Sequence, residues 1–408
     1  MNCRFCSSKT DLPLIDLGSS PASNSYLDAE AANKPERWIP LKVVVCRCCW
    51  LAQTEGDFAA EEFFSPDYAY FSSFSTAWLK HAEDYSAAMI SRFALSKASK
   101  VVEVASNDGY LLQNFKAAGI PCLGIEPTAS TAKAARAKGI ETIETFFGRE
   151  AGRKLAEDGW SADLTAANNV LAHVPDIADF VGGFAEILKP DGVATFEFPH
   201  LVNLIGSSQF DTIYHEHYSY ISLTTANNVL ERAGLRIFDV EELPTHGGSL
   251  RVYAQRANGG MKQVTPAVNR LLEREKSAGV TDPAFYAGFQ ARAVRIKNDL
   301  LRFLLDASAE GKTVAAYGAA AKGNTLLNFA GIRPDLIPFV VDKNPAKQGR
   351  LMPGSRIPIV DEARLRDERP SYILILPWNL KTEIIGQLDY AREWGAKFVT
   401  AIPNLNVE

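Results

Sequence analysis

Short apolar runs alternate along much of the chain with longer segments whose apolar residues recur at helical spacing. The first clear run, at residues 101–105, is rich in β-branched residues; it breaks at Ser-Asn-Asp-Gly and resumes as a helical pattern from residue 110. Similar runs follow at residues 121–126, 139–143, 163–170, 193–198 and 250–255. Regular alternation of strand and helix is typical of a doubly wound α/β fold with a largely parallel sheet.

The last third of the chain repeats this alternation. A long helical pattern at residues 283–309 precedes a buried strand at 313–318, a small-residue turn and a further helix. Strands are expected at residues 337–341, 372–376 and 398–402. The turn carries Lys322 before Gly323, so it is not a Walker A loop, and it also lacks the G-x-G-x-x-G pattern of an NAD site. We therefore expect a second α/β unit without a standard dinucleotide motif.

The first 70 residues have a different character, and the prolines at positions 13, 21, 35 and 40 favour loops and short strands. Two C-x-x-C pairs lie about forty residues apart, and Cys48 is a third candidate within the second pair. Matching spacing selects the four ligands Cys3, Cys6, Cys46 and Cys49. Four thiolates leave no open coordination position, so the sequence predicts one structural zinc ion.

The turn after residues 101–104 has the spacing Glu103-x-Ala105-x-Asn107-x-Gly109. Alanine is the smallest replacement for glycine, and asparagine tolerates positive φ better than most residues. The next strand ends in Glu126, a carboxylate suited to binding ribose hydroxyls. A nucleotide site is the favoured interpretation, and an ordinary βα turn with two acids is the alternative.

Two polar segments and one strand end are further candidates for chemistry. Residues 210–220 contain His215-Glu216-His217 beside tyrosines, and an imidazole next to a carboxylate is suited to proton transfer near neutral pH. The alternatives for this segment are a metal site and a polar loop without a role in chemistry. Residues 245–251, with two consecutive glycines, fit either a tight turn or a site. The strand at 163–170 ends in Asn168-Asn169, where doubly wound sheets bind ligands.

Composition narrows the class of protein. The 408 residues are enough for two or three domains, and 47% hydrophobic with 22% charged residues is ordinary for a globular chain. A formal net charge of −5 gives no support to nucleic-acid binding. Apolar runs end before membrane-spanning length and the N-terminus lacks a signal-peptide pattern, so we expect a cytoplasmic protein without membrane contact. There, six cysteines favour metal ligands or free thiols over disulfides.

Taken together in their order, these motifs resemble one family. The turn at Glu103 resembles the E-x-G-x-G-x-G turn of class I S-adenosylmethionine-dependent methyltransferases, with two glycines replaced. The two C-x-x-C pairs, Gly-Ile-Glu-Pro, Ile-Tyr-His-Glu-His-Tyr-Ser-Tyr, His-Gly-Gly-Ser-Leu-Arg and Gly-Ala-Ala-Ala-Lys-Gly-Asn resemble, over nearly the whole chain, the sugar C-methyltransferases that methylate C3 of dTDP-linked 4-keto deoxysugars.

The resemblance implies a zinc-binding domain at residues 1–70, a class I, Rossmann-like methyltransferase core at 71–257 and a Rossmann-like domain at 258–408 that helps to bind the nucleotide sugar. It implies an enzyme that removes a proton next to the ketone and methylates the resulting enolate. His217 is the implied base, and Glu216 and Tyr214 match neighbouring active-site positions. His173 is the implied group at the C4 oxygen, and Tyr68, with Tyr70 as the alternative, is the implied tyrosine of the pocket.

Cofactor and substrate contacts are assigned in the same way. The implied S-adenosylmethionine contacts are Glu103, Ala105, Ser106, Asn107, Asp108, Gly109, Glu126, Pro127, Asn168 and Asn169. The candidate substrate contacts are His246, Ser249, Arg251, Lys322, Asn324 and Lys347, the two lysines for the diphosphate. Alternatives are an O- or N-methyltransferase of another metabolite, a non-catalytic zinc module that binds nucleotides and, last, an NAD-linked oxidoreductase.

Overall fold

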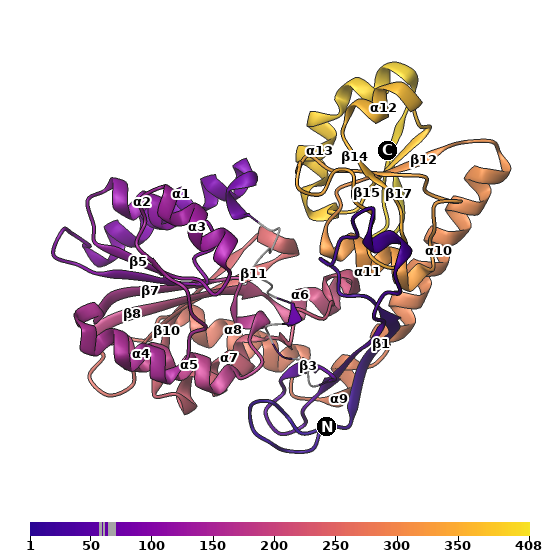
Figure 1. Ribbon diagram of the computed structural model, residues 1–408. Coiled ribbons are helices and arrows are strands. Elements are labelled where there is room, and N and C mark those ends of the chain that lie inside the picture. The colour runs from indigo at the N-terminus through magenta and orange to yellow at the C-terminus, as the bar shows by residue number, and fades with distance from the viewer. Residues whose placement is uncertain (57–58, 60–61, 64–70) are drawn as a thin grey trace.

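The computed structural model describes residues 1–56, 59, 62–63 and 71–408. The strands of this part of the chain form sheets of four, seven and six strands. Figure 1 shows the seven-stranded sheet on one side of the molecule and the six-stranded sheet on the other, with the N-terminal strands below and between them. Among the described residues, no helix combines the length and apolar character that crossing a membrane requires.

The seven-stranded sheet has the order β10-β11-β8-β7-β4-β5-β6. Its strands are β4 (Val101–Val104), β5 (Cys122–Ile125), β6 (Thr142–Ile143), β7 (Ala162–Asn168), β8 (Leu188–Pro199), β10 (Leu235–Leu243) and β11 (Ser249–Arg256). The five strands from β6 to β8 are parallel, whereas β11 runs antiparallel to both neighbours. The chain proceeds from β4 outward to β6 and then returns to β7 on the other side, so the order reverses between β4 and β7, where doubly wound sheets bind ligands.

Helices cover both faces of this sheet. One face carries α1 (Thr76–Phe93), α2 (Leu112–Ala117) and α3 (Ala129–Ala137), and the other carries α4 (Arg149–Leu155), α5 (Ile177–Ile187), α7 (Leu223–Arg232) and α8 (Pro266–Ala278) (Figure 1). All four residues of β4 are buried, as expected for a strand covered on both sides. The sequence-predicted helix from residue 110 begins at Leu112. Helix α1 ends at Phe93, because Ala94 adopts a left-handed cap with φ 49°.

The four-stranded sheet is antiparallel and draws on two distant parts of the chain. Its strands are β1 (Leu12–Ser20), β2 (Ile39–Val45), β3 (Ala52–Thr54) and β9 (Ser219–Tyr220), in that order. The fourth strand therefore comes from the middle of the chain, directly after the His215-Glu216-His217 segment, and ties that segment to the N-terminal region.

The six-stranded sheet has the order β14-β13-β12-β15-β16-β17 and is parallel except for β17. It contains β12 (Val314–Tyr317), β13 (Val340–Val341), β14 (Ile359–Val360), β15 (Tyr372–Ile375), β16 (Lys397–Thr400) and β17 (Asn406–Val407). The helices of this region are α10 (Phe289–Ala309), α11 (Ala321–Ala330), α12 (Ala363–Glu368) and α13 (Lys381–Gln387). The long helix predicted at 283–309 is divided into α9 (Pro283–Tyr286) and α10, because Gly288 between them has φ 78°.

One apolar core joins the first and last thirds of the chain. Buried residues of β1 and β2, such as Leu14 and Val43, belong to the same cluster as Ile296 and Leu300 of α10 and Leu326 of α11. The short helix α6 (Leu201–Gly206) also contributes to this cluster. The N-terminal sheet is therefore fixed to the C-terminal unit as well as to the seven-stranded sheet.

Candidate functional site

Two matching turns bring the four predicted cysteine ligands together. In each C-x-x-C pair, the amide after the second cysteine donates to the carbonyl of the first: Ser7 to Cys3 at 3.0 Å and Trp50 to Cys46 at 2.8 Å. Ser7 and Trp50 both have positive φ, 61° and 62°. The sulfur atoms of Cys3, Cys6, Cys46 and Cys49 all lie within 4.8 Å of one another. Sulfur atoms on a tetrahedral zinc ion would be about 3.8 Å apart, so this donor set fits such an ion.

Cys48 does not belong to this cluster. Its side chain is exposed, and its backbone amide donates to the Cys46 sulfur at 3.4 Å. An N–H···S bond within a C-x-x-C turn stabilises negative charge on the sulfur, which suits a metal-bound thiolate.

The turn that follows β4 has the backbone that its spacing predicted. Ala105, Asn107 and Gly109 occupy the three glycine positions of the motif, and all have positive φ, 58°, 50° and 76°. At Gly109 a side chain would collide with Ile140, since a Cβ there would lie 2.4 Å from its Cδ1 atom. Gly124 in β5 plays a similar part, because a Cβ there would lie 2.4 Å from the Ser106 hydroxyl.

Acidic side chains surround this turn. One Glu126 oxygen accepts from the Asn107 amide at 2.9 Å and the other from the Thr128 amide at 3.0 Å. Asp108 forms an ion pair with Lys138 at 3.2 Å. Burial, with the nearby charges of Glu126 and Asp108, raises the pKa of Glu103 well above its usual range. A cationic ligand would relieve this cost, whereas an anionic one would increase it.

Unsatisfied polar atoms mark the neighbouring strand end. Asn168 ends β7, and the following Asn169 has φ 56°. Both side-chain amide atoms of each residue are buried and have no hydrogen-bond partner within the described ranges. Because Ala166 pairs with Glu103 across the sheet, these amides lie beside the β4 turn at the reversal of strand order. Buried amides without partners are costly unless a ligand completes them. Pro127, another implied cofactor contact, directly follows Glu126. The residues implied to contact the cofactor therefore lie together where β4 and β7 end.

The histidine segment forms a second cluster, centred on His217. The His217 ring lies 4.5 Å from the His173 ring and 3.9 Å from the Tyr214 ring, measured between centroids. Thr212, Ser219 and Tyr220 line a small cavity together with His217. The His217 Nδ1 atom lies 2.8 Å from the Thr212 carbonyl oxygen, so Nδ1 carries the proton and Nε2 keeps its lone pair in the neutral ring.

Burial keeps these rings neutral. It lowers the pKa of His217 well below its usual value, and the positive charge of Lys322 acts in the same direction. Burial likewise lowers the pKa of His173 to about 4 and that of His246 to about 4. A neutral His217 with a free Nε2 lone pair can accept a proton without first losing one.

The histidine segment is held from three directions. The Thr54 amide of β3 donates to the Tyr218 carbonyl at 3.0 Å, and Thr325 of α11 donates to the Ile213 carbonyl at 2.9 Å. The Trp378 indole donates to the buried Asp211 carboxylate at 2.8 Å. His215, the other histidine of the His-x-His pair, lies against the Ile39 carbonyl at 3.1 Å, away from the centre of the cluster.

The His246-Gly-Gly segment approaches the C-terminal unit. A Cβ at Gly247 would lie 2.6 Å from the Trp378 ring, and one at Gly248 would lie 2.3 Å from the Asn203 amide. The two glycines therefore allow close packing of the protein against itself. His246 lies 5.2 Å from the Trp78 ring, and Ser249 donates back to the Thr245 carbonyl at 3.0 Å.

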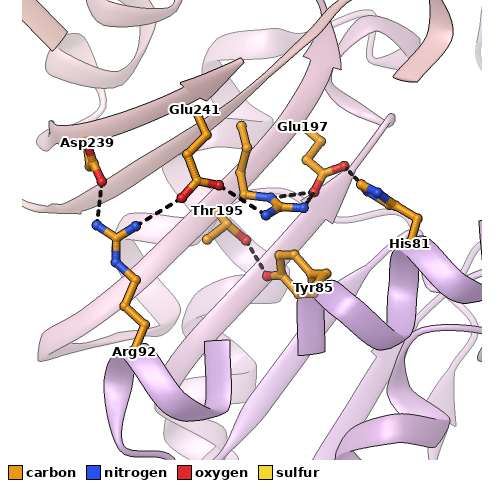
Figure 2. Close-up of polar contacts among 8 residues, drawn as sticks. His81, Tyr85, Arg92, Thr195, Glu197, Asp239 and Glu241 are labelled. Atoms are coloured by element: carbon orange, nitrogen blue, oxygen red, sulfur yellow. Dashed lines mark hydrogen bonds and ion pairs between the residues drawn. The ribbon is translucent and has the colours of Figure 1, made fainter. Parts of the chain in front are cut away.

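Arg251 is engaged within the protein. It contacts Glu197 of β8 at 2.6 Å and Glu241 of β10 at 3.2 Å, and its guanidinium lies 4.8 Å from the Tyr85 ring centroid. Figure 2 shows that this network continues to α1, where His81 contacts Glu197 and Arg92 contacts Asp239. Arg251, a predicted substrate contact, thus has internal partners on both neighbouring strands and on α1.

The three predicted contacts in the C-terminal unit lie in different surroundings. Lys322 donates to Asn379 at 2.7 Å and lies over the Trp378 ring; burial lowers its pKa. Asn324 is fully buried and donates to the Ser23 carbonyl at 3.2 Å. Lys347 donates to the Ala319 carbonyl at 2.7 Å and pairs with Asp342 at 3.7 Å. The charge of Lys322 acts on the His217 cluster.

Several contacts of the site carried no sequence signal. Asn24 donates to both oxygens of Glu216, and Asp211 is paired with Trp378. His81, on the α1 face towards Glu197, also belongs to this group. Their partners lie more than 100 positions away in the chain, so no local pattern identifies them. Tyr68 and its alternative Tyr70 lie outside the described residues.

The chain matches known proteins along nearly its whole length. Family models match residues 3–64 ("Putative zinc binding domain"), 78–240 ("Methyltransferase domain") and 244–403 ("C-methyltransferase C-terminal domain"). These matches and the fold define a methyltransferase with a Rossmann-like core. C-methyltransferase NovU of Streptomyces niveus is 36% identical over 405 residues, which span 99% of this chain and 96% of NovU. The chain belongs to this family of C-methyltransferases.

Solved structures match parts of the chain at lower similarity. Magnesium protoporphyrin IX methyltransferase from Synechocystis PCC 6803, with bound SAH, is 14% identical; the match covers 44% of this chain and 83% of that one, with a TM-score of 0.35. The PH0226 protein from Pyrococcus horikoshii OT3 is 12% identical, with coverage of 48% and 95% and a TM-score of 0.38. Similarities of this size support no conclusion about ligands.

The left-handed backbone at Ala105 leads to a stability prediction. A residue with a Cβ pays about 1 kcal/mol or more at positive φ, and glycine removes that cost at the expense of a more flexible unfolded chain. We expect Ala105→Gly to stabilise the fold by about 0.5 kcal/mol. The matched control Ala88→Gly, exposed in the middle of α1, should destabilise it by about 1 kcal/mol. Urea unfolding of both variants measures the difference, and equal destabilisation would contradict the role of the turn.

Proposed function

We propose that this C-methyltransferase uses S-adenosylmethionine to methylate the carbon next to the ketone of a nucleotide-linked 4-keto deoxysugar, at C3 of a dTDP-sugar. The observation that carries the proposal is the His217 ring, which is neutral, buried and fixed by its Nδ1–H bond to Thr212. A base of this kind suits removal of a proton from carbon. Methylation of an oxygen or nitrogen has less need for it.

The β4 turn and the Asn168-Asn169 strand end are the proposed cofactor site. The incomplete hydrogen bonding of the two asparagines and the acidic surroundings of Glu103 suit a ligand with polar groups and a positive charge. Glu126, directly beside the turn, is the proposed partner of the ribose hydroxyls. When bound there, S-adenosylmethionine supplies an electrophilic methyl group on a sulfonium ion.

The protein residues have separate tasks in the proposed reaction. His217 Nε2 accepts the proton from C3, and the electron pair of the C–H bond moves into a C3–C4 double bond as the C4 oxygen gains negative charge. His173, at 4.5 Å from the His217 ring, is the proposed group at that oxygen. Glu216 and Tyr214 orient the sugar, together with Tyr68. Lys322, beside the cluster, is the proposed cation for the sugar nucleotide, whereas Asn324 and Lys347 are proposed to shape the turn that receives it.

The four-cysteine cluster is the proposed zinc site, and its role is structural. Cys49 lies three residues before β3, which pairs with β9 next to His217. Loss of the metal would therefore disturb the strand that fixes the histidine segment.

A pair of cysteine variants tests the zinc site. Cys46→Ser should reduce zinc from one ion per chain to well below one, and it should lower methyl transfer at least tenfold because β3 loses its anchor. Cys48→Ser, in the same turn but outside the cluster, should keep the wild-type zinc content and the wild-type rate of methyl transfer. Zinc is measured with a chelating dye after denaturation, and methyl transfer by mass spectrometry. Full zinc content in Cys46→Ser would contradict the ligand assignment.

Hydrogen–deuterium exchange tests the reaction. The protein is incubated in D₂O with S-adenosylmethionine and a panel of nucleotide-linked 4-keto-6-deoxysugars, which are followed by mass spectrometry. The expected result is a gain of one methyl group in the product, and deuterium at the carbon next to the ketone in the sugar that has not yet been methylated. His217→Gln should bind both ligands but lose exchange by about 10²- to 10⁴-fold. Wild-type rates in this variant would exclude His217 as the base.

The pH dependence follows from the environment of His217. The base must be neutral to act, and its lowered pKa keeps it neutral as the pH falls through 6.5. We expect the exchange rate to stay level from pH 8 to pH 6 and to fall only at lower pH. Exchange rates measured at a saturating concentration of the sugar at each pH check this expectation. Far-UV circular dichroism at each pH is the control for folding. A half-maximal rate at pH 6.5 or above would contradict the assignment.

A further inference from the structure

A tight turn of the N-terminal region lies between the histidine segment and the C-terminal unit. This turn, Ala22 to Tyr26, is closed by two backbone bonds: the Ser25 amide donates to the Ala22 carbonyl at 3.1 Å, and the Tyr26 amide donates to the Asn24 carbonyl at 3.0 Å. Its side chains point to both neighbours, and Ser23 and Tyr26 are buried.

On one side, the turn contacts Glu216. The Asn24 amide nitrogen donates to Glu216 Oε1 at 2.8 Å and to Oε2 at 2.9 Å. Glu216 is 2% exposed, so the direction of its carboxylate is set by protein contacts and not by water. An amide NH₂ group can only donate, and it therefore matches a carboxylate, which accepts with both oxygens.

On the other side, the turn contacts the loop between β12 and α11. Tyr26 donates its hydroxyl to the Ala319 carbonyl at 2.6 Å, and Ser23 accepts from Asn324 at 3.2 Å. Lys347 donates to the same Ala319 carbonyl and lies 5.1 Å from the centre of the Tyr26 ring. The position of Asn24 is thus determined by the C-terminal unit.

From these contacts we infer that Asn24 is a positioning residue for the methyl-transfer reaction. It fixes the carboxylate of Glu216, the residue that precedes the base His217 in the chain, and it does so only when the C-terminal unit is seated against the Ala22–Tyr26 turn. This inference rests on the proposed function, in which Glu216 orients the sugar beside His217. Misplacement of a group that orients a substrate by about 1 Å costs about 10²-fold in rate.

Substitution of Asn24 tests the inference. Asn24→Ala removes both hydrogen bonds, and Asn24→Asp keeps the size of the side chain but places a second carboxylate against Glu216. We expect kcat for deuterium exchange to fall 10- to 100-fold in Asn24→Ala and further in Asn24→Asp, while the Kd for S-adenosylmethionine stays within twofold of wild type. Asn33→Asp, an exposed position in the same region, is the matched control and should keep the wild-type rate. Wild-type kcat in either Asn24 variant would overturn the inference.

A double variant separates positioning from folding. Asn24→Asp with Glu216→Gln restores a donor and an acceptor with their places exchanged, so the melting temperature should return to the wild-type value. The exchange rate should stay low, because residue 216 no longer carries a carboxylate. Recovery of the wild-type rate would show that the pair serves only the fold, and would overturn the inference.

The experiment also distinguishes this inference from the proposed function. If the wild-type protein binds S-adenosylmethionine but exchanges no keto sugar, the proposed function fails, and the inference fails with it. If the wild type exchanges and methylates the sugar at the same rate as the Asn24 variants, only the positioning role fails.

Discussion

The histidine segment depends on hydrogen bonds that it cannot make by itself. Its buried polar groups obtain partners from β3, from Asn24, from α11 and from Trp378, which belong to the first 54 residues or to the last 90. Buried donors and acceptors without partners would be costly, so the segment can adopt this conformation only after the outer regions have packed against it. The seven-stranded sheet supplies the adjoining His173, but it does not by itself complete the site.

Features set by short-range geometry were predicted well from the sequence. The C-x-x-C spacing selected Cys46 over Cys48, because only the flanking cysteines of that turn can face one ion. The Glu103 turn was predicted despite its missing glycines, and the reason lies in φ: Ala105 and Asn107 adopt the left-handed conformation that the motif requires. The alternation of strands and helices in the two α/β units follows from the same local rules.

Long-range contacts account for what the sequence did not reveal. Asn24 lies 192 positions from Glu216, and neither residue has a neighbour that signals the pairing. Arg251 follows a motif with two glycines and was assigned to the substrate, but it lies on a strand between two carboxylate-bearing strands, and these determine its contacts. A charged side chain near a motif binds a ligand only if the fold leaves its charge unmatched, and that balance is a property of the assembled sheet.

The contacts at Asp342 have a consequence for selectivity. In dinucleotide-binding folds, a carboxylate at the end of the second strand binds the ribose hydroxyls of the cofactor. Here the corresponding carboxylate, at the end of β13, accepts from the Ala319 and Asn344 amides at 2.8 Å each and pairs with Lys347. Any ligand that used this carboxylate as a ribose partner would have to share it with the two amides. The C-terminal unit thus retains the architecture of a dinucleotide-binding domain with its strand-end carboxylate already bound by the protein.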